Sequence, residues 1–362
     1  MIITEKITLS FCIPTYNRIS FLKKNLSILV NQVRCFNLSS QISIYVSDNA
    51  SKDGTGLMLK EFKSQNKDII FDYVIQEKNI GQDANFITVM NMATGDYSVL
   101  MGDDDFLKED ALLYIYKMII DNSDVGIFVS SVTKVDVNGN CLREKYFVRE
   151  DIDSLKVNFN NKKEISNYFR LCIDLGGLLS FISSVVYKTS VLSEIKFDNN
   201  EFMGYQAFSF LPYWWRYLMA GNTLLYQKKS YINNTAGDST AYLGIGVSRI
   251  LIDYRSYISI AQNIIKDSSL QLDFLSVLKI AHSQIGLRTV ALRETSKFKK
   301  ELLPLLKEID LDSKDANIIV TSLKFKYVFR DMIYCVLPAK LINVVSSFLY
   351  QIRKIISRVK VY

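Results

Sequence analysis

The segment Tyr97-Ser-Val-Leu-Met-Gly-Asp-Asp-Asp105 joins a short apolar run to three consecutive aspartates. Residues 97–101 have the composition of a buried β-strand. Adjacent carboxylates repel one another, and the arrangement is costly unless a cation compensates. A divalent metal bridging to a diphosphate is such a cation, and it also neutralises charge on a departing nucleoside diphosphate. The alternative is a solvated turn that opens the helix expected from Glu109, since acidic residues suit a helix N-terminus.

Strand-like and helix-like segments alternate on both sides of this stretch. The strand-like runs are residues 7–13, 42–46, 69–75, 97–101 and 125–131, and the helix-like segments between them are residues 21–33, 56–62, 84–92 and 109–120. This rhythm predicts an α/β fold with a mainly parallel sheet and helices on both faces. Residues 175–187 read as a turn and a buried strand, and residues 202–220 as an aromatic helix. Beyond about residue 248 the sequence pattern predicts helices to the end of the chain.

Polar clusters follow each of the first four strands, at residues 14–18, 47–54, 76–81 and 102–105. Parallel sheets bind ligands at the carboxyl ends of their strands. Asp48 can accept hydrogen bonds from a base or ribose there; it can instead cap the next helix, a role that Asp53 fits better. Gly81 permits close backbone approach. Asp83 and Asn85 are within reach of a nucleotide, although a plain loop-to-helix turn also explains them.

Composition narrows the class of protein. The chain has 362 residues, 49% of them hydrophobic and 22% charged, which suits a protein with a globular core. Residues 321–362 contain eight basic residues and one acidic residue, which account for the whole net charge of +7. This placement argues against a nucleic-acid-binding surface spread over the fold. Apolar residues interleaved with Lys and Arg suit the surface of an anionic membrane, and a packed helix with a solvated basic face is the alternative.

Several chemistries are excluded. The one histidine, His282, rules out a multi-histidine metal site, so any metal binds to oxygen ligands. No G-x-G-x-x-G, P-loop or G-x-S-x-G motif occurs, which disfavours dehydrogenases, P-loop NTPases and serine hydrolases. Five cysteines without a C-x-x-C pair indicate reduced thiols. With no apolar leader and no long apolar window, we expect a cytoplasmic protein.

Four segments resemble a known family. Ser10-Phe-Cys-Ile-Pro-Thr-Tyr-Asn-Arg18, Val46-Ser-Asp-Asn-Ala-Ser-Lys-Asp-Gly-Thr55, Asn79-Ile-Gly81 and Gly102-Asp-Asp-Asp105 resemble, in order and spacing, the family-2 glycosyltransferases of the GT-A fold. The match covers roughly residues 5 to 130. The pattern Asn79-x-Gly-x-Asp-x-Asn85, followed by Gly95-Asp-Tyr97, looks most like abequosyltransferase-type enzymes of bacterial surface polysaccharide assembly.

The resemblance implies roles for individual residues. Asp105 would hold Mg or Mn together with Asp103, which would also contact ribose or sugar. The residues implied to bind the nucleotide sugar are Pro14, Thr15, Tyr16, Arg18, Asp48, Asn79, Gly81, Asp83, Asp103 and Asp104.

Family members are inverting enzymes, in which a carboxylate base deprotonates the acceptor hydroxyl that attacks the anomeric carbon. Many relatives carry a Glu-Asp pair beyond residue 170, and this chain has none. We take Glu201 as the base, with Asp198, Asp174 and Asp238 as alternatives. The aromatic cluster around Trp214 and Trp215 could stack on acceptor sugars, yet such helices usually build core.

These observations predict a GT-A domain in residues 1–245 and a helical region with a basic tail in residues 246–362. The expected reaction moves a sugar from a nucleotide-diphosphate donor to a lipid-linked oligosaccharide in surface polysaccharide synthesis. Membrane contact through the tail would place the enzyme on the inner face of the cell membrane. The missing Glu-Asp pair motivates the alternative, a non-catalytic module that binds nucleotide sugar or a partner protein.

Overall fold

The computed structural model describes residues 7–136, 138–194, 208–235, 246–282 and 294–308. The described residues fall into two compact units. The first comprises the described residues up to 235 together with residues 252–281, and the second comprises residues 246–251, 282 and 294–308. All described candidate site residues belong to the first unit. The predicted division at residue 245/246 stays a prediction.

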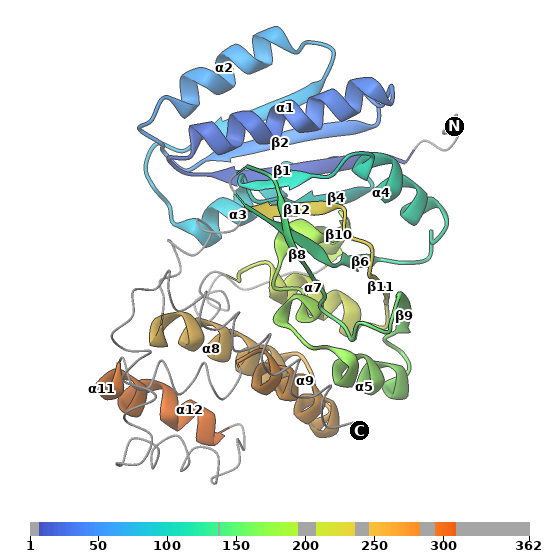
Figure 1. Ribbon diagram of the computed structural model, residues 1–362, viewed down its shortest axis with the longest axis vertical. Coiled ribbons are helices and arrows are strands. Elements are labelled where there is room, and N and C mark those ends of the chain that lie inside the picture. Colours follow the sequence, from blue (N-terminus) through green and yellow to red (C-terminus); the bar gives the residue numbers. More distant parts are fainter. Residues whose placement is uncertain (1–6, 137, 195–207, 236–245, 283–293, 309–362) are drawn as a thin grey trace, which may run out of the picture. The chain divides into compact units, whose positions relative to one another are not determined.

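An eight-stranded sheet forms the centre of the first unit (Figure 1). Its strand order is β3-β2-β1-β4-β10-β6-β11-β9. Strands β1 to β4 are mutually parallel, β6 and β11 are parallel to each other, and β10 and β9 are antiparallel to their neighbours. The predicted mainly parallel sheet is confirmed. The strands are β1 (Leu9–Thr15), β2 (Ile42–Asp48), β3 (Ile70–Ile75), β4 (Tyr97–Leu100), β6 (Ile127–Ser130), β9 (Ser154–Asn158), β10 (Val185–Lys188) and β11 (Thr223–Gln227).

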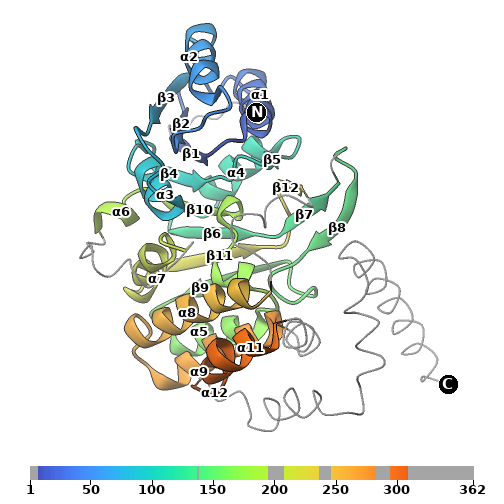
Figure 2. The ribbon, with the colours of Figure 1, turned by 90° about the vertical axis from the view of Figure 1, so that its left-hand side faces the viewer.

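Helices cover both faces of this sheet (Figure 2). Helices α1 and α4 share one face, where Leu112 N of α4 donates to Gln32 Oε1 of α1 at 3.2 Å. Helices α3 and α7 share the other face, where Phe86 packs near Phe210 with ring centroids 6.0 Å apart. The helices of this unit include α1 (Ile19–Cys35), α2 (Thr55–Gln65), α3 (Gln82–Met90), α4 (Ala111–Ile120), α5 (Lys162–Leu171), α6 (Val191–Glu194), α7 (Leu211–Met219) and α9 (Ser268–Ala281), with 3₁₀ turns η1 (Leu175–Leu178) and η2 (Ile182–Ser184).

The start of α1 shows why the polar loops are ordered. The predicted stripe of Leu22, Leu26, Leu29 and Val33 is buried. The helix begins at Ile19, whose N–H donates to Asp53 Oδ2 at 2.9 Å. Asp53 Oδ1 also accepts from Thr55 N at 3.2 Å, at the start of α2. Capping by Asp53 is therefore confirmed, and one carboxylate serves the first turns of two helices.

A second, four-stranded sheet lies beside the main one, with the order β5-β12-β7-β8. Its strands are β5 (Asp105–Leu107), β12 (Ile232–Thr235), β7 (Val132–Val135) and β8 (Cys141–Lys145). The sequence placed Asp105 in a loop, whereas in the structure it opens β5. The reason is long-range pairing: the partner of Asp105 is Asn234 of β12, which local sequence patterns do not reveal.

The aromatic segment is core, as expected. Trp214 and Trp215 of α7 are fully buried, and Trp215 packs edge-on against Phe274 of α9, with ring centroids 5.0 Å apart. The C-terminal helices are α8 (Val247–Asn263), α9, α11 (Thr295–Lys297) and α12 (Leu303–Glu308), with a π-helical turn η4 (Phe298–Leu302). The basic tail, residues 321–362, lies outside the described residues. Among the helices that the structure describes, none has the length and apolarity needed to span a membrane.

Candidate active site

The acid triplet follows β4, with Asp103 and Asp104 in the turn and Asp105 opening β5, and all three residues are buried. Asp103, Asp104 and Asp105 are 5%, 7% and 4% exposed. The alternative that these residues form a solvent-exposed turn before the next helix is therefore wrong. Burying three adjacent carboxylates requires specific partners, because an unpaired buried charge is very costly.

Arg18, in the loop after β1, provides a cation for two of these carboxylates. Its Nε lies 3.3 Å from Asp103 Oδ1, and its Nη2 lies 2.7 Å from Asp104 Oδ2. Thr15 Oγ1 donates to Asp103 Oδ2 at 2.7 Å. The guanidinium also lies over the ring of Phe21, 4.8 Å from its centroid. Residues at or just after the ends of β1 and β4 thus form one cluster, because these two strands are parallel neighbours and end at the same side of the sheet.

Asp105 is held by neutral groups instead. Ser183 Oγ donates to its Oδ2 and Asn234 Nδ2 to its Oδ1, each at 2.5 Å. Ser183 also accepts from Gly102 N at 2.9 Å, which ties η2 to the acid turn. Among the described residues no cation forms an ion pair with Asp105. Neither Ser183 nor Asn234 was found from the sequence.

Burial also changes the protonation of the cluster. It raises the pKa of Asp103 to about 7, against the opposing effect of Arg18, and the charge of Asp104 adds to the rise. Burial and the charge of Asp104 raise the pKa of Asp105 as well. A cation bound at this cluster would favour the ionised carboxylates.

Asp48 ends β2 beside Thr15, its register partner on β1. The side chain is completely buried, and its Oδ1 accepts from Ser51 N at 3.1 Å. Its Oδ2 is buried without a hydrogen-bond partner among the described residues. Burial raises the pKa of this carboxyl group. A buried acceptor left open at the carboxyl edge fits an O–H or N–H donor from a ligand.

The loop before α3 is fastened to the loop after β2. Asn49 Oδ1 accepts from Ile80 N at 2.8 Å, and Asn49 Nδ2 donates to Asn79 Oδ1 at 3.1 Å. Asn79 Oδ1 also accepts from Gly81 N at 2.9 Å. Gly81 has φ +87°, a conformation that L side chains rarely adopt, so glycine is required here.

The remaining candidates are placed as follows. Pro14 is buried at the end of β1, and Tyr16 is half-buried in the loop that follows. Asp83 Oδ1 accepts from Ser209 N at 3.1 Å, so it anchors the segment that leads into α7. Asp174 caps η1 through Gly176 N at 2.9 Å and pairs with Lys145 at 2.9 Å. Glu201, Asp198 and Asp238 lie outside the described residues.

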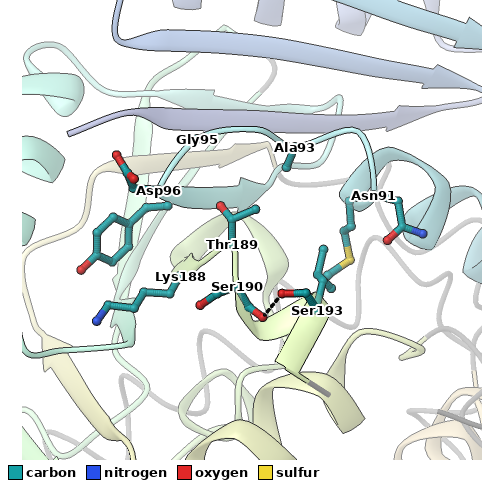
Figure 3. Close-up of a pocket in the computed structure, with 11 residues that line it drawn as sticks. Asn91, Ala93, Gly95, Asp96, Lys188, Thr189, Ser190 and Ser193 are labelled. Carbon is teal, nitrogen blue, oxygen red and sulfur yellow. Dashed lines mark hydrogen bonds between the residues drawn. The ribbon is translucent and has the colours of Figure 1, made fainter. Parts of the chain in front are cut away.

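A cavity of about 660 Å³ lies near the amino-terminal end of β4, away from the strand end that carries the acid cluster (Figure 3). It is lined in part by Asp96, Lys188, Thr189 and Ser190, next to the first residue of β4. Asp96 is already engaged, because its Oδ2 accepts from the backbone N and the hydroxyl of Thr8. This cavity includes no residue of the acid cluster.

The chemistry of the donor set allows a divalent metal with a small number of protein ligands. Within the part of the chain that the structure describes, no three His, Cys, Asp or Glu side chains are grouped to hold an ion. Mg²⁺ typically takes one or two carboxylates together with substrate phosphates. Asp105 offers two carboxylate oxygens that accept from neutral groups and have no ion-pair partner among the described residues, so it fits that mode together with Asp103. Asp103 and Asp104 already share Arg18.

A substitution tests the open acceptor. Asp48→Asn keeps the shape but places an N–H₂ group next to either the ligand or Ser51 N. If Asp48 Oδ2 accepts from the nucleotide, binding should weaken about tenfold or more. Titration calorimetry with UDP, GDP, CDP and dTDP measures this, with Asp72→Asn on β3 as the matched control. Unchanged binding by Asp48→Asn would remove Asp48 from the site.

Comparisons with known proteins identify the family of this chain. Residues 10–176 match the model of glycosyl transferase family 2. The chain is 32% identical to the abequosyltransferase RfbV of Salmonella typhimurium over 275 residues, which cover 75% of this chain and 79% of that protein.

Solved structures agree in fold. TarS from S. aureus in complex with UDP-GlcNAc superposes with a TM-score of 0.59 at 14% identity, covering 84% of this chain and 80% of that chain. The mannosyltransferase PcManGT of Pyrobaculum calidifontis, in complex with GDP-Man and Mn²⁺, gives a TM-score of 0.52 at 16% identity, covering 91% and 84%. The fold is therefore GT-A-like, and the chain is an enzyme that belongs to glycosyltransferase family 2.

Proposed function

We propose that this glycosyltransferase moves a sugar, with inversion, from a nucleotide-diphosphate donor to a hydroxyl of a lipid-linked oligosaccharide in surface polysaccharide synthesis. The observation that carries the donor assignment is the placement of Asp48, with its open oxygen, beside the buried acid cluster at one sheet edge. The relative named as an abequosyltransferase supports the polysaccharide setting. The neighbours solved with UDP-GlcNAc and GDP-Man support the donor class.

Each group at the sheet edge has a distinct task. Asp48 accepts a hydrogen bond from the base or ribose. Asn79 and Gly81 form the side of the nucleotide pocket, with Asn49 fixing their loop. Pro14 and Thr15 at the end of β1 and Tyr16 in the loop that follows line the pocket, and Arg18 pairs with Asp103 and Asp104 beside the sugar and ribose.

Asp105 and Asp103 would hold Mg or Mn. When bound, the metal supplies positive charge that neutralises the departing nucleoside diphosphate. The neighbour that contains Mn²⁺ supports this choice of ion. Ser183 and Asn234 orient the Asp105 carboxylate through one hydrogen bond to each oxygen.

Glu201 is our proposal for the base that removes the acceptor proton. The acceptor oxygen then forms a bond to the anomeric carbon, the bond to the nucleoside diphosphate breaks, and the proton stays on the carboxyl group. Asp198, Asp174 and Asp238 are the alternatives. We also propose that the basic tail holds the enzyme on the inner face of the cell membrane, near its lipid-linked acceptor.

Metal binding should depend on pH through the acid cluster. Because burial raises the pKa of Asp103 to about 7, the metal-free folded protein holds a proton that the unfolded chain loses near pH 4. The free energy of unfolding of the metal-free protein therefore falls as the pH rises from about 4 to about 7. Mn²⁺ must displace that proton below this pH, so its affinity should fall roughly tenfold per pH unit there. Calorimetric titration at about pH 6 and about pH 8 tests this, and equal affinities would reject the assignment.

A donor panel tests the function itself. Common nucleotide-diphosphate sugars are incubated with the protein, Mn²⁺ and a lipid-linked oligosaccharide, and products are identified by mass spectrometry. A donor at about 100 times its Kd should also stabilise the protein by roughly 2.7 kcal/mol. Thermal stabilisation without transfer of sugar would favour the non-catalytic binding module, which the missing Glu-Asp pair suggests. No stabilisation by any donor would reject both.

A further inference from the structure

A row of polar side chains crosses the second sheet from the acid cluster outward, along the paired strands β5, β12 and β7. Figure 2 shows β12 beside β7. Asn234 of β12 is the register partner of Asp105 on one side and of Lys134 of β7 on the other. Residues in register share a face of a sheet, so the three side chains lie on one face. Asn234 Nδ2 donates to Asp105, and Lys134 Nζ donates to Asn234 Oδ1. The amide therefore links the carboxylate to an ammonium group.

Lys134 is a half-buried cation without a countercharge in contact. Its Nζ also lies over the ring of Phe181, 5.8 Å from the ring centroid. Among the described residues no carboxylate forms an ion pair with it. An ammonium group has three N–H donors, and Asn234 uses one. Burial lowers the pKa of Lys134, with Lys145 adding to the effect. An anion bound next to this ammonium group would offset the cost of its burial and favour its charged form.

The charges around Lys134 also favour an anion. Arg143 of β8 is its register partner on the outer side, and its side chain is exposed. Lys145 forms an ion pair with Asp174 at 2.9 Å. Asp105 lies on the other side of Asn234 from Lys134. Its charge raises the pKa of Lys134 by less than burial and the charge of Lys145 together lower it. Lys134 and Arg143 therefore place two positive charges in register on adjacent strands, on the face of the sheet that also carries Asp105.

We infer that Lys134 binds the diphosphate of the nucleotide-sugar donor and stabilises the charge that the leaving nucleoside diphosphate gains. This inference rests on the proposed donor chemistry. When the bond between the anomeric carbon and the diphosphate oxygen breaks, the bonding electron pair stays with the diphosphate, which gains one negative charge. A fixed ammonium group beside those oxygens stabilises the transition state more than the bound donor. Asn234 is the positioning residue, because it holds both Lys134 and Asp105.

Lys134→Met removes the charge and keeps the length of the side chain, whereas Lys134→Arg retains the charge. The matched control is Lys108→Met, since Lys108 directly follows β5 and pairs with Glu144 at 3.4 Å. UDP, GDP, CDP and dTDP are titrated into each protein by calorimetry, with and without Mn²⁺, and so is the nucleoside of whichever diphosphate binds the wild type. Lys134→Met should weaken binding of the diphosphate about tenfold or more, and leave binding of the nucleoside unchanged. Lys134→Arg should recover most of the affinity.

Three results would overturn the inference. Equal binding of the diphosphate by wild type and Lys134→Met would remove Lys134 from the site. Equal weakening for diphosphate and nucleoside would mean that Lys134 acts only by maintaining the structure around β7. Weakening by Lys108→Met as large as by Lys134→Met would show a general effect of charge. A wild-type protein that binds none of the diphosphates would instead reject the donor assignment.

Discussion

Asp105→Asn should reduce the rate of sugar transfer by about a thousandfold, which corresponds to ~4 kcal/mol of lost transition-state stabilisation. The substitution removes a negative charge and keeps the shape of the side chain. The hydroxyl of Ser183 can turn to accept from the new amide, and Asn234 can continue to donate, so the protein should stay folded. The expected loss therefore comes from the metal that the carboxylate would hold.

The measurement is transfer of sugar to a lipid-linked acceptor at saturating donor, combined with Mn²⁺ titration by calorimetry. Asp96→Asn is the matched control, because Asp96 immediately precedes the other end of the same strand, β4, and lines the separate cavity there. It should change the rate of transfer little. Wild-type Mn²⁺ affinity and wild-type rate in Asp105→Asn would show that the metal is not held by this carboxylate.

Arg18→Met should lower the free energy of unfolding of the metal-free protein by about 3 kcal/mol, because it leaves two buried carboxylates without their cation. The side chain of Arg18 is 14% exposed, and those of Asp103 and Asp104 are 7% and 9% exposed. Solvent therefore screens these ion pairs poorly. Chemical denaturation followed by circular dichroism measures the difference.

The pH dependence of this effect has a defined sign. The pKa of Asp103 is already raised to about 7 by burial, and loss of Arg18 would raise it further. At about pH 5 the carboxyl group of the variant is protonated, so the loss of Arg18 should cost less there than at about pH 8.

Arg34→Met is the control for the loss of an arginine. Arg34 pairs with Asp68 at 2.8 Å, but the side chains are 43% and 50% exposed. Exposed pairs contribute little, so this variant should lose less than about 1 kcal/mol. Equal destabilisation by Arg18→Met and Arg34→Met would contradict the description of the acid cluster as a buried network.

The alternation of strands and helices was readable from the sequence because each element carries its own local pattern. The stripe of Leu22, Leu26 and Leu29 identifies α1 from its helical spacing, and the structure buries it. The polar loops after β1 to β4 also follow from local order, since parallel strands end at a common edge. Thr15, Arg18 and the acid triplet could therefore be grouped before their contacts were known.

The partners of Asp105 could not be predicted in this way. Ser183 lies 78 residues away along the chain and Asn234 lies 129 residues away. Each is a common polar residue without a motif, and only the pairing of β5 with β12 makes Asn234 relevant. Lys134 was missed for the same reason. Strand β5 has only three residues and begins with an acid, so it has no periodicity that marks it as a strand.

The most direct test of the account is a crystal of the full chain grown with Mn²⁺ and the nucleoside diphosphate that binds best, with anomalous scattering recorded at the manganese edge. We expect a manganese peak within about 2.5 Å of an Asp105 oxygen, as first-row divalent ions bind carboxylates. The nucleotide should donate a hydrogen bond to Asp48 Oδ2. A nucleotide bound in the cavity beside Asp96 and Lys188, or a manganese peak away from the acid cluster, would contradict the account.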